Sequence, residues 1–472
     1  MTPLDSWIES EARFAAGAML RSVSATNLVK DRPGFGQRVA PQPGSVLASP
    51  VPAAYDPDPD YFFHWFRDSA IIVDALRAAE ADGLEKRIAV DRLREFVEFN
   101  RSLRELDGRE LVRNERLREK VQPSFLQYVR PDAEIATVFG DRVLAEARVN
   151  PDGTLDFTRW ARPQNDGPAL EVLALTGWCD ADLDLDEGLR AAMLELVIGD
   201  LDFICSRTSE RSFDIWEEEN GYHYYTRLVQ AEALARGAEW RKEAGHVAHA
   251  RACRSAANEL VSSLDAFWSG RGGYYRSRTS VIGGISEKAL DISVILGVLH
   301  AGRKGGTHSV LDPKAQATLA ALENLFDAEY AVNIKRPRER GPAMGRYAND
   351  AYFGGNPWYL ATLAAAEFYF GLAIALLSSG VMPETNENER FRHQLIAADG
   401  ARRNLDFATA ALERGDTFMR TVQAYTSASG DLSEQFDRTT GAQTSAKHLA
   451  WSYAAFITAA ASRRRAVQAI RG

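Results

Sequence analysis

The segment DIWEEE, residues 214–219, places four acidic residues within six positions, beside Trp216 and directly before a predicted helix. Carboxyl groups packed this closely raise each other's pKa, and a neighbouring apolar ring raises it further by removing water. One of the four can therefore keep its proton near neutral pH, as a general acid must. The alternative is that these acidic residues only complement the dipole of the helix.

A second candidate carboxylate, Glu434, lies in the segment LSEQFD, residues 432–437, between Gly430 and Gly441. Cleavage of a glycosidic bond needs two carboxyl groups on opposite sides of the bond, one to protonate the leaving oxygen and one to activate water or attack. Glu217 and Glu434 are candidates for such a pair. Taken alone, Glu434 would more often cap a loop or pair with Arg438.

Aromatic and hydrogen-bonding side chains recur in the same segments as these carboxylates. Five of the nine tryptophans lie in or just after polar loops, namely Trp65, Trp160, Trp216, Trp358 and Trp451. The same loops carry Arg67, Asp68, Arg162, Arg346 and Asp350. Flat rings stack on sugar faces, and charged groups bind hydroxyls. Core packing is the usual role of a single tryptophan, and Asp68 can also cap the next helix, but the repetition favours a carbohydrate site.

Other chemistries lack the residues they need. The chain has no GxGxxG, phosphate-binding loop or HExxH motif, and no GxSxG motif with a plausible partner set. His64, His223 and His300 do not fall at metal-ligand spacing, so we expect no catalytic metal and no organic cofactor. The three cysteines, Cys179, Cys205 and Cys253, are far apart in sequence and fit neither a zinc site nor a disulfide framework. We expect them to be reduced and structural.

Helical periodicity recurs along the whole chain, whereas strand-like alternation is scarce. Twelve helices are predicted, near residues 5–21, 69–82, 86–105, 168–178, 186–206, 221–237, 240–268, 288–302, 312–328, 357–379, 400–414 and 444–465. Every second helix follows a loop rich in aromatic and charged residues, so six such loops alternate with shorter connections. This alternation predicts an all-α toroid of six helix pairs, with the rich loops around one mouth. No compositional break indicates a second domain, so we expect one domain over residues 1–472.

Charge and hydropathy exclude several partners. The net charge of -9 provides no basic field for nucleic acid. Residues 358–377 approach the length of a membrane span, but Glu367 lies at the centre, which favours a buried inner helix over a membrane segment. The first twenty residues carry no signal-peptide pattern. We therefore expect a cytoplasmic monomer that does not associate with membranes.

Several of these segments together resemble the glucoamylases, the inverting enzymes of glycoside hydrolase family fifteen that release glucose from the ends of starch. The resemblance spans nearly the whole chain through SWIESEARFA, VLASP, DPDYFFHWFRDS, RPQNDGPAL, DIWEEENG, GRYANDAYFGGNPWYLATLAAAE and GDLSEQFDRTTGAQTSAKHLAWSYAAF. It implies an (α/α)6 barrel with a pocket at its mouth, Glu217 as general acid and Glu434 as general base. Asp214 is the rival candidate for the base, and it ranks second because it is so close to Glu217 in sequence.

The resemblance also implies a binding shell for the substrate. The terminal glucose would contact Tyr61, Trp65, Arg67, Asp68, Glu218, Arg346 and Trp451, with Trp160, Tyr352 and Trp358 around it or toward the next sugar. The chain departs from the family's best-known members in the charged insert KRPRE, residues 335–339, and in Phe66, and we expect no separate starch-binding module. We expect exo-acting release of β-D-glucose from the non-reducing ends of α-1,4-linked glucans and maltooligosaccharides, with α-1,6 linkages as further candidates and short chains favoured over raw starch. The alternatives are another linkage, as in isomaltose, dextran or trehalose, or a non-catalytic glucan-binding regulatory domain.

Overall fold

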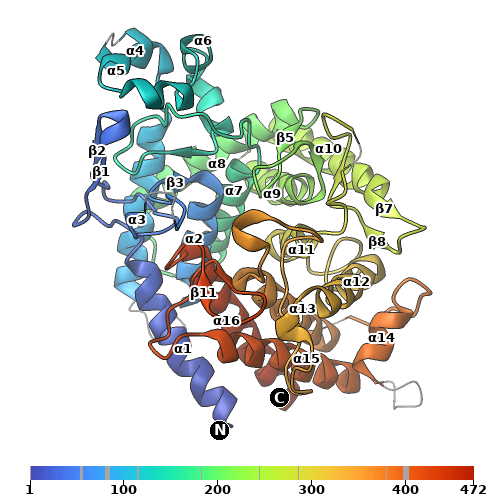
Figure 1. Cartoon of the computed structure of the whole chain (residues 1–472). Coiled ribbons are helices and arrows are strands. Elements are labelled where there is room, and N and C mark those ends of the chain that lie inside the picture. The colour runs from blue at the N-terminus through green and yellow to red at the C-terminus, as the bar shows by residue number, and fades with distance from the viewer. Residues whose placement is uncertain are drawn as a thin grey trace.

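Six helices form a closed inner ring in the computed structural model (Figure 1). They are α2 (Phe66–Ala79), α7 (Gly167–Asp180), α9 (Tyr224–Glu243), α11 (Ser293–Ala301), α13 (Tyr359–Ser378) and α16 (Ala450–Arg471). Each packs against the next, and α16 closes the ring on α2. The structure describes residues 2–53, 57–79, 86–113, 116–181, 183–243, 245–284, 286–378, 380–396 and 403–472.

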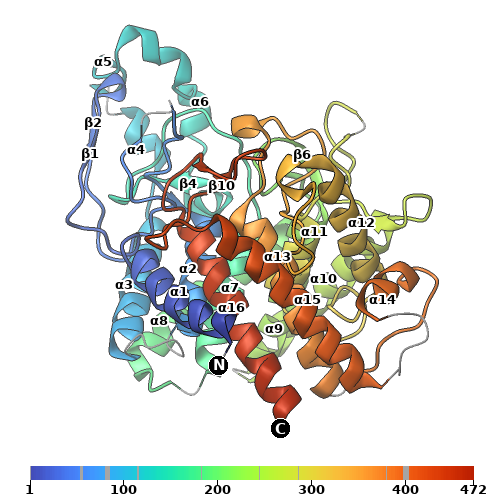
Figure 2. The same ribbon diagram turned by 60° about the horizontal axis from the view of Figure 1, so that its bottom comes forward.

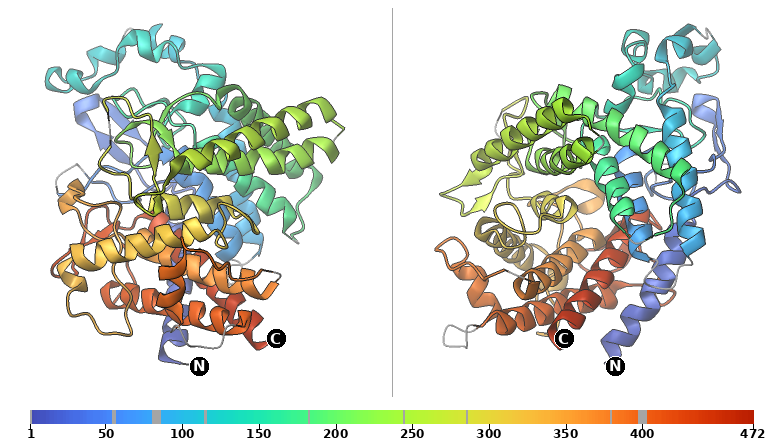
Figure 3. Two further views of the ribbon diagram at one scale, coloured as in Figure 1. Left: turned by 90° about the vertical axis from the view of Figure 1, so that its right-hand side faces the viewer. Right: turned by 180° about the vertical axis from the view of Figure 1, so that it is seen from behind.

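Six further helices form an outer layer around this ring. They are α1 (Pro3–Leu20), α3 (Lys86–Leu103), α8 (Glu187–Arg207), α10 (Val247–Leu264), α12 (Pro313–Glu329) and α15 (Asn404–Tyr425). Each packs on one or two inner helices, and the two layers are seen together from behind in Figure 3. The helix α1 lies along α16, so the two ends of the chain are neighbours (Figure 2). The fold is the predicted (α/α)6 barrel.

The inner helices are apolar on nearly all sides because neighbours surround them. The clearest case is α13, which by length and composition is the one described helix that could cross a membrane, although 72% of that stretch is buried in the fold. Its Glu367 is held by hydrogen bonds from the hydroxyls of Thr458, at 2.7 Å, and Ser462, at 3.3 Å. As predicted, this segment is an inner helix of the barrel.

All twelve predicted helices are present, but several begin later than the periodicity indicated. Residues 221–223 belong to strand β6 (Asn220–His223), and Thr444 belongs to β11 (Gln443–Thr444), which pairs with β10 (Gln435–Phe436). The backbone groups just before these helices therefore bond to neighbouring loops rather than to the next helical turn. At the other end, α15 and α16 extend beyond their predicted limits, whereas residues 400–402 lie outside the described residues.

The loops contain short strands and helical turns that periodicity did not reveal. The remaining strands pair antiparallel: β1 (Lys30–Arg32) with β2 (Gln37–Val39), β3 (His64–Trp65) with β4 (Arg148–Val149), β6 with β5 (Ser212–Phe213) and β9 (Arg278–Thr279), and β7 (Trp268–Ser269) with β8 (Tyr274–Tyr275). The short helices are α4 (Gly108–Arg113), α5 (Arg116–Glu119), α6 (Asp132–Ile135) and α14 (Glu389–Leu395). Among the strand pairs, β3–β4 and β10–β11 hold the loops directly before α2 and α16 in place.

The cysteines differ from the sequence-based expectation in one respect. Cys205 on α8 and Cys253 on α10 lie with their Sγ atoms 3.7 Å apart, although 48 positions separate them in sequence. All three cysteines are free thiols. Two adjacent outer helices thus bring together a pair that could not be recognised from its spacing.

Candidate active site

A cavity of about 330 Å³ opens where the loops before the inner helices converge. Thirteen predicted site residues line it: Tyr61, Trp65, Arg67, Asp68, Trp160, Trp216, Glu217, Glu218, Arg346, Tyr352, Trp358, Glu434 and Trp451. Four lining residues were not predicted, namely Ala48, Ala161, Ile215 and Leu449. Three predicted residues, Asp214, Arg162 and Asp350, do not line the cavity.

The carboxyl group of Glu217 is held by donors on both of its oxygens. The indole N–H of Trp65 donates to Oε1 at 2.7 Å, and that of Trp160 donates to Oε2 at 2.5 Å. The amide of Gln164 donates to Oε1 at 2.9 Å, and Arg67 lies 3.4 Å from the same oxygen. Three side chains from two loops therefore orient this carboxyl, with Arg67 supplying positive charge beside it.

The backbone turn that presents Glu217 is organised by Asp214. Glu217 has a φ of 65°, a left-handed conformation that a residue with a side chain seldom adopts. The carboxylate of Asp214 accepts hydrogen bonds from the backbone N–H groups of Trp216, Glu218 and Glu219, at 2.8 to 3.2 Å. It also forms a buried ion pair with Arg278 at 2.9 Å. Asp214 thus supports the turn from behind, and it is not on the cavity wall as a second catalytic carboxylate would be.

Glu434 reaches the cavity from the loop before α16 and is almost fully buried. Burial raises the pKa of Glu434 to about 7. Hydrogen bonds from the hydroxyls of Ser445 and Tyr61 favour the carboxylate and partly oppose this rise. The Tyr61 hydroxyl lies 3.0 Å from Oε1 and 2.6 Å from the hydroxyl of Tyr352. Ser445 was not predicted, although it lies in a quoted motif, because a serine in a polar loop carries no distinguishing signal.

Glu218 also lines the cavity, and its partners differ from those of Glu217 and form a charged cluster. Its oxygens accept hydrogen bonds from the hydroxyl of Tyr347, at 2.5 and 2.8 Å, and from Lys288 at 2.7 Å. Arg346 lies 3.1 Å away and is held in turn by Asp350 at 2.5 Å. Although burial opposes it, Arg346 and the donors from Lys288 and Tyr347 lower the pKa of Glu218. The wall therefore presents a fixed carboxylate and a fixed guanidinium.

Arg67 and Asp68 form a second polar group at the start of α2. Arg67 is ion-paired with Asp166 at 3.3 Å and with Asp68 at 3.4 Å, and it donates to Gln164 at 2.9 Å. Burial raises the pKa of Asp68 to about 6, with Arg67 opposing the rise. The guanidinium carbon also lies 5.8 Å from the ring centroid of Trp451 on α16. These groups can donate to and accept from several hydroxyls at once.

Aromatic rings complete the cavity wall. Trp65 meets Tyr61 and Trp160 edge to face, with ring centroids 5.3 and 6.2 Å apart. Trp216 and Trp358 lie 5.4 Å apart on the side of Arg346. Arg162 pairs with Glu146 at 2.5 Å and with Asp156 at 3.1 Å, and it is not among the residues that line the cavity. Arg162 therefore supports the wall and does not contact the cavity.

The lining matches what a sugar-binding pocket needs. It combines flat rings with fixed donors and acceptors, and it holds two carboxyl groups, Glu217 and Glu434, that come from different loops. Within the described ranges, no three His, Cys, Asp or Glu side chains are grouped so that they could hold a metal ion. The carboxyl pair and its donors are suited to acid–base chemistry at a bound sugar.

Comparisons with known proteins agree with this geometry. The family model "Glycosyl hydrolases family 15" matches residues 35–461. The chain is 28% identical to "Glucoamylase 1" of Rhizopus oryzae, covering 97% of this chain and 70% of that protein. It is 30% identical to "Glucoamylase P" of Amorphotheca resinae, covering 98% and 70%. It superposes on the family 15 glucoamylase of Hypocrea jecorina with a TM-score of 0.78 at 27% identity, covering 98% of this chain and 72% of that one.

Proposed function

The chain belongs to family 15 of the glycosyl hydrolases, and on that premise we propose that it removes glucose from the non-reducing ends of α-1,4-linked glucans. The observation that carries this proposal is the convergence of Glu217 and Glu434, from two separate loops, on one cavity with aromatic walls. A binding domain without activity would not need both.

The size of the cavity supports attack at a chain end. At about 330 Å³ it is near the lower limit of small-molecule pockets, which span about 300–1,000 Å³. It accommodates a terminal sugar better than an internal stretch of polysaccharide. We propose short maltooligosaccharides as the substrates. We also propose a monomer as the working unit, because a single chain already supplies both carboxyl groups and the aromatic walls of the cavity.

The proposed mechanism is a single displacement with inversion. Glu217 gives its proton to the glycosidic oxygen while the C1–O bond breaks, and Glu434 takes a proton from the water that attacks C1 from the opposite face. The product is β-D-glucose. Inversion requires room for this water, so we expect the two carboxyl groups to lie roughly 6.5–9.5 Å apart, whereas about 5 Å would favour retention.

The remaining lining residues would bind the terminal glucose. The guanidinium groups of Arg67 and Arg346 and the carboxylates of Asp68 and Glu218 provide fixed partners for hydroxyls, and Trp451 offers a ring face below them. Because these polar groups are paired with one another, they are oriented before the substrate arrives. Preorganised groups of this kind lose little freedom on binding.

The test is to incubate the purified protein with maltose, maltoheptaose, isomaltose and trehalose, and to follow glucose release and its anomeric form. We expect β-glucose from maltose and maltoheptaose, and loss of about 10²–10⁴-fold in kcat for Glu217→Gln and for Glu434→Gln. Glu219→Gln is the matched control, since Glu219 is in the same acidic segment but pairs with Arg278 and Ser286 outside the cavity.

Each outcome decides between the candidate functions. Release of α-glucose would contradict inversion, and preference for isomaltose or trehalose would replace the α-1,4 assignment. Binding of maltose with no hydrolysis of any substrate would establish a glucan-binding protein.

A further inference from the structure

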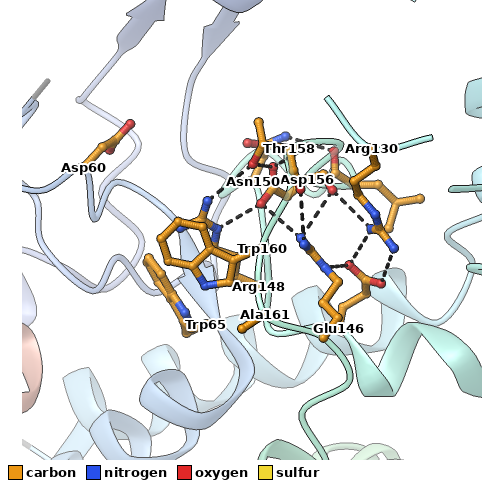
Figure 4. Close-up of polar contacts among 12 residues, drawn as sticks. Asp60, Trp65, Arg130, Glu146, Arg148, Asn150, Asp156, Thr158, Trp160 and Ala161 are labelled. Atoms are coloured by element: carbon orange, nitrogen blue, oxygen red, sulfur yellow. Dashed lines mark hydrogen bonds and ion pairs between the residues drawn. The ribbon is translucent and has the colours of Figure 1, made fainter. Parts of the chain in front are cut away.

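Arg148 lies directly behind the two tryptophans that hold Glu217 (Figure 4). Its guanidinium carbon is 3.5 Å from the ring centroid of Trp160, 4.8 Å from that of Trp65 and 3.9 Å from that of Phe63. Its side chain is only 1% exposed, so the charge is removed from water. A desolvated cation against several aromatic faces is among the strongest cation–π arrangements.

The backbone sets this arrangement. Arg148 on β4 is the register partner of Trp65 on β3, and directly opposite residues of an antiparallel pair project to the same face. The two side chains are therefore neighbours by strand pairing. The third ring, Trp160, comes from the loop that returns after β4.

The guanidinium is fixed from its other side by Asp156. Arg148 Nε donates to Asp156 Oδ2 at 2.9 Å, and a terminal nitrogen lies 3.4 Å from the Thr158 hydroxyl. Asp156 is locked by a hydrogen bond from the hydroxyl of Thr158, at 2.6 Å, and by an ion pair with Arg162 at 3.1 Å. The guanidinium of Arg148 is therefore held between the carboxylate of Asp156 and the two indole rings.

Both indoles that rest on Arg148 use their N–H groups for one carboxyl. Trp65 donates to Oε1 of Glu217 and Trp160 to Oε2. A positive charge at the ring face draws electron density from the indole and strengthens its N–H as a donor, as expected for polarised chains of interactions in a low-dielectric site. One buried cation thus sets the orientation of both donors and their strength.

We propose that Arg148, although it does not line the cavity, is a positioning residue for the general acid and acts through Trp65 and Trp160. The inference rests on the proposed role of Glu217 as the proton donor. It predicts that the loss of Arg148 harms the step in which the leaving group is protonated more than any other step.

The experiment compares two substrates with different leaving groups. Maltose needs a proton on its departing oxygen, whereas α-D-glucosyl fluoride expels fluoride without one, and in both cases the attacking water gives its proton to Glu434. For Arg148→Met we expect kcat on maltose to fall about 10²-fold and kcat on the fluoride by less than about threefold, since general acid catalysis contributes about 10²–10⁴-fold. Glu217→Gln is expected to show the same selectivity in stronger form.

Arg130→Met is the matched control. Arg130 is buried to a similar degree, with 4% of its side chain exposed, and it pairs with Glu146 at 2.9 Å in the same network. In the described structure its guanidinium stacks on neither indole. This variant should lose stability comparably but keep the wild-type ratio of the two rates. Arg148→Lys retains the positive charge, so its kcat on maltose should be at least tenfold higher than that of Arg148→Met.

Equal losses on both substrates, or the same selectivity in Arg130→Met, would overturn the inference and leave Arg148 a purely structural residue. If Arg148→Met does not fold, Arg148→Lys carries the test, with an expected loss of about five- to tenfold on maltose and less than about twofold on the fluoride. A wild-type protein that hydrolyses neither substrate would contradict the proposed function itself.

Discussion

Replacing Ser445 by alanine is expected to move the pH dependence of hydrolysis toward higher pH. The hydroxyl of Ser445 donates to Oε2 of Glu434, and this bond exists in full only while Glu434 is a carboxylate. Burial already raises the pKa of Glu434 from 4.5 to about 7. This rise corresponds to about 3 kcal/mol against the charged form at about 1.36 kcal/mol per unit. Removing a hydrogen-bond donor to this buried carboxylate should disfavour its charged form by a further amount of about 1.5–3 kcal/mol.

The sign follows from the role of Glu434 as a base. Only the carboxylate can accept the proton of water, so kcat/KM should fall as the pH drops through the pKa of Glu434 in the free enzyme. For the wild-type protein this acidic limb is expected near pH 7. For Ser445→Ala it should begin about one to two units higher, which is the energetic cost above divided by about 1.36 kcal/mol.

The assay is kcat/KM on maltose across the pH range, for the wild type, for Ser445→Ala and for a matched serine variant. Ser433→Ala serves as the match, because Ser433 is fully buried next to Glu434 but donates to the backbone oxygen of Gln435. Its acidic limb should coincide with that of the wild type. Superimposable limbs for Ser445→Ala and the wild type, or a wild-type limb below about pH 5, would refute the reasoning.

Three further predictions follow from the same structure. Asp214→Asn should lower the free energy of unfolding by about 3 kcal/mol, because it leaves Arg278 with less compensating charge. The folded variant should nevertheless retain more than a tenth of the wild-type kcat. A loss of kcat as large as that of Glu434→Gln would instead make Asp214 the base. Oxidised glutathione should convert Cys205 and Cys253 into a disulfide and release two equivalents of reduced glutathione. Closing this loop should raise the free energy of unfolding by about 4 kcal/mol. An unchanged thiol count, or a disulfide that includes the third cysteine, would contradict this prediction. Finally, because the pKa of Glu434 is raised, the folded protein binds a proton at this residue more tightly than the unfolded chain does between about pH 4.5 and pH 7. Glu434 should therefore make the free energy of unfolding fall as the pH rises through that window. In chemical unfolding measured across this range, Glu434→Gln should show a flatter dependence on pH than the wild type.

The helices and the site loops could be predicted from the sequence because their signals are local. Apolar periodicity locates a helix such as α13, and charge and aromatic density locate the loops that precede the inner helices. The starts of α9 and α16 were placed too early, since residues 221–223 and 444 have their backbone bonds taken by strands from other loops. Such pairing depends on segments far away in the chain and leaves no periodic trace.

Some side chains of the site could likewise be predicted from the sequence, whereas the orientation of others could not. Glu217 and Glu434 were recognisable from residue type and motif, and the cavity includes both. Arg162 and Asp350 lie in the correct loops, but their side chains face Glu146 and Arg346 instead of the cavity. Sequence position alone does not determine which way a loop side chain points.

The number and order of the twelve barrel helices, the loops that carry the chemistry and the two carboxylates could all be predicted from the sequence. These features depend on residue type and on neighbours within a few turns. The side chains that support those carboxylates could be identified only in the folded protein. They are Ser445 and Tyr61 on Glu434, Asp214 beneath the turn of Glu217, and Arg148 behind its two tryptophans. The pKa of a carboxyl and the orientation of an indole depend on burial and on contacts between distant segments, and these exist only when the ring of helices has closed.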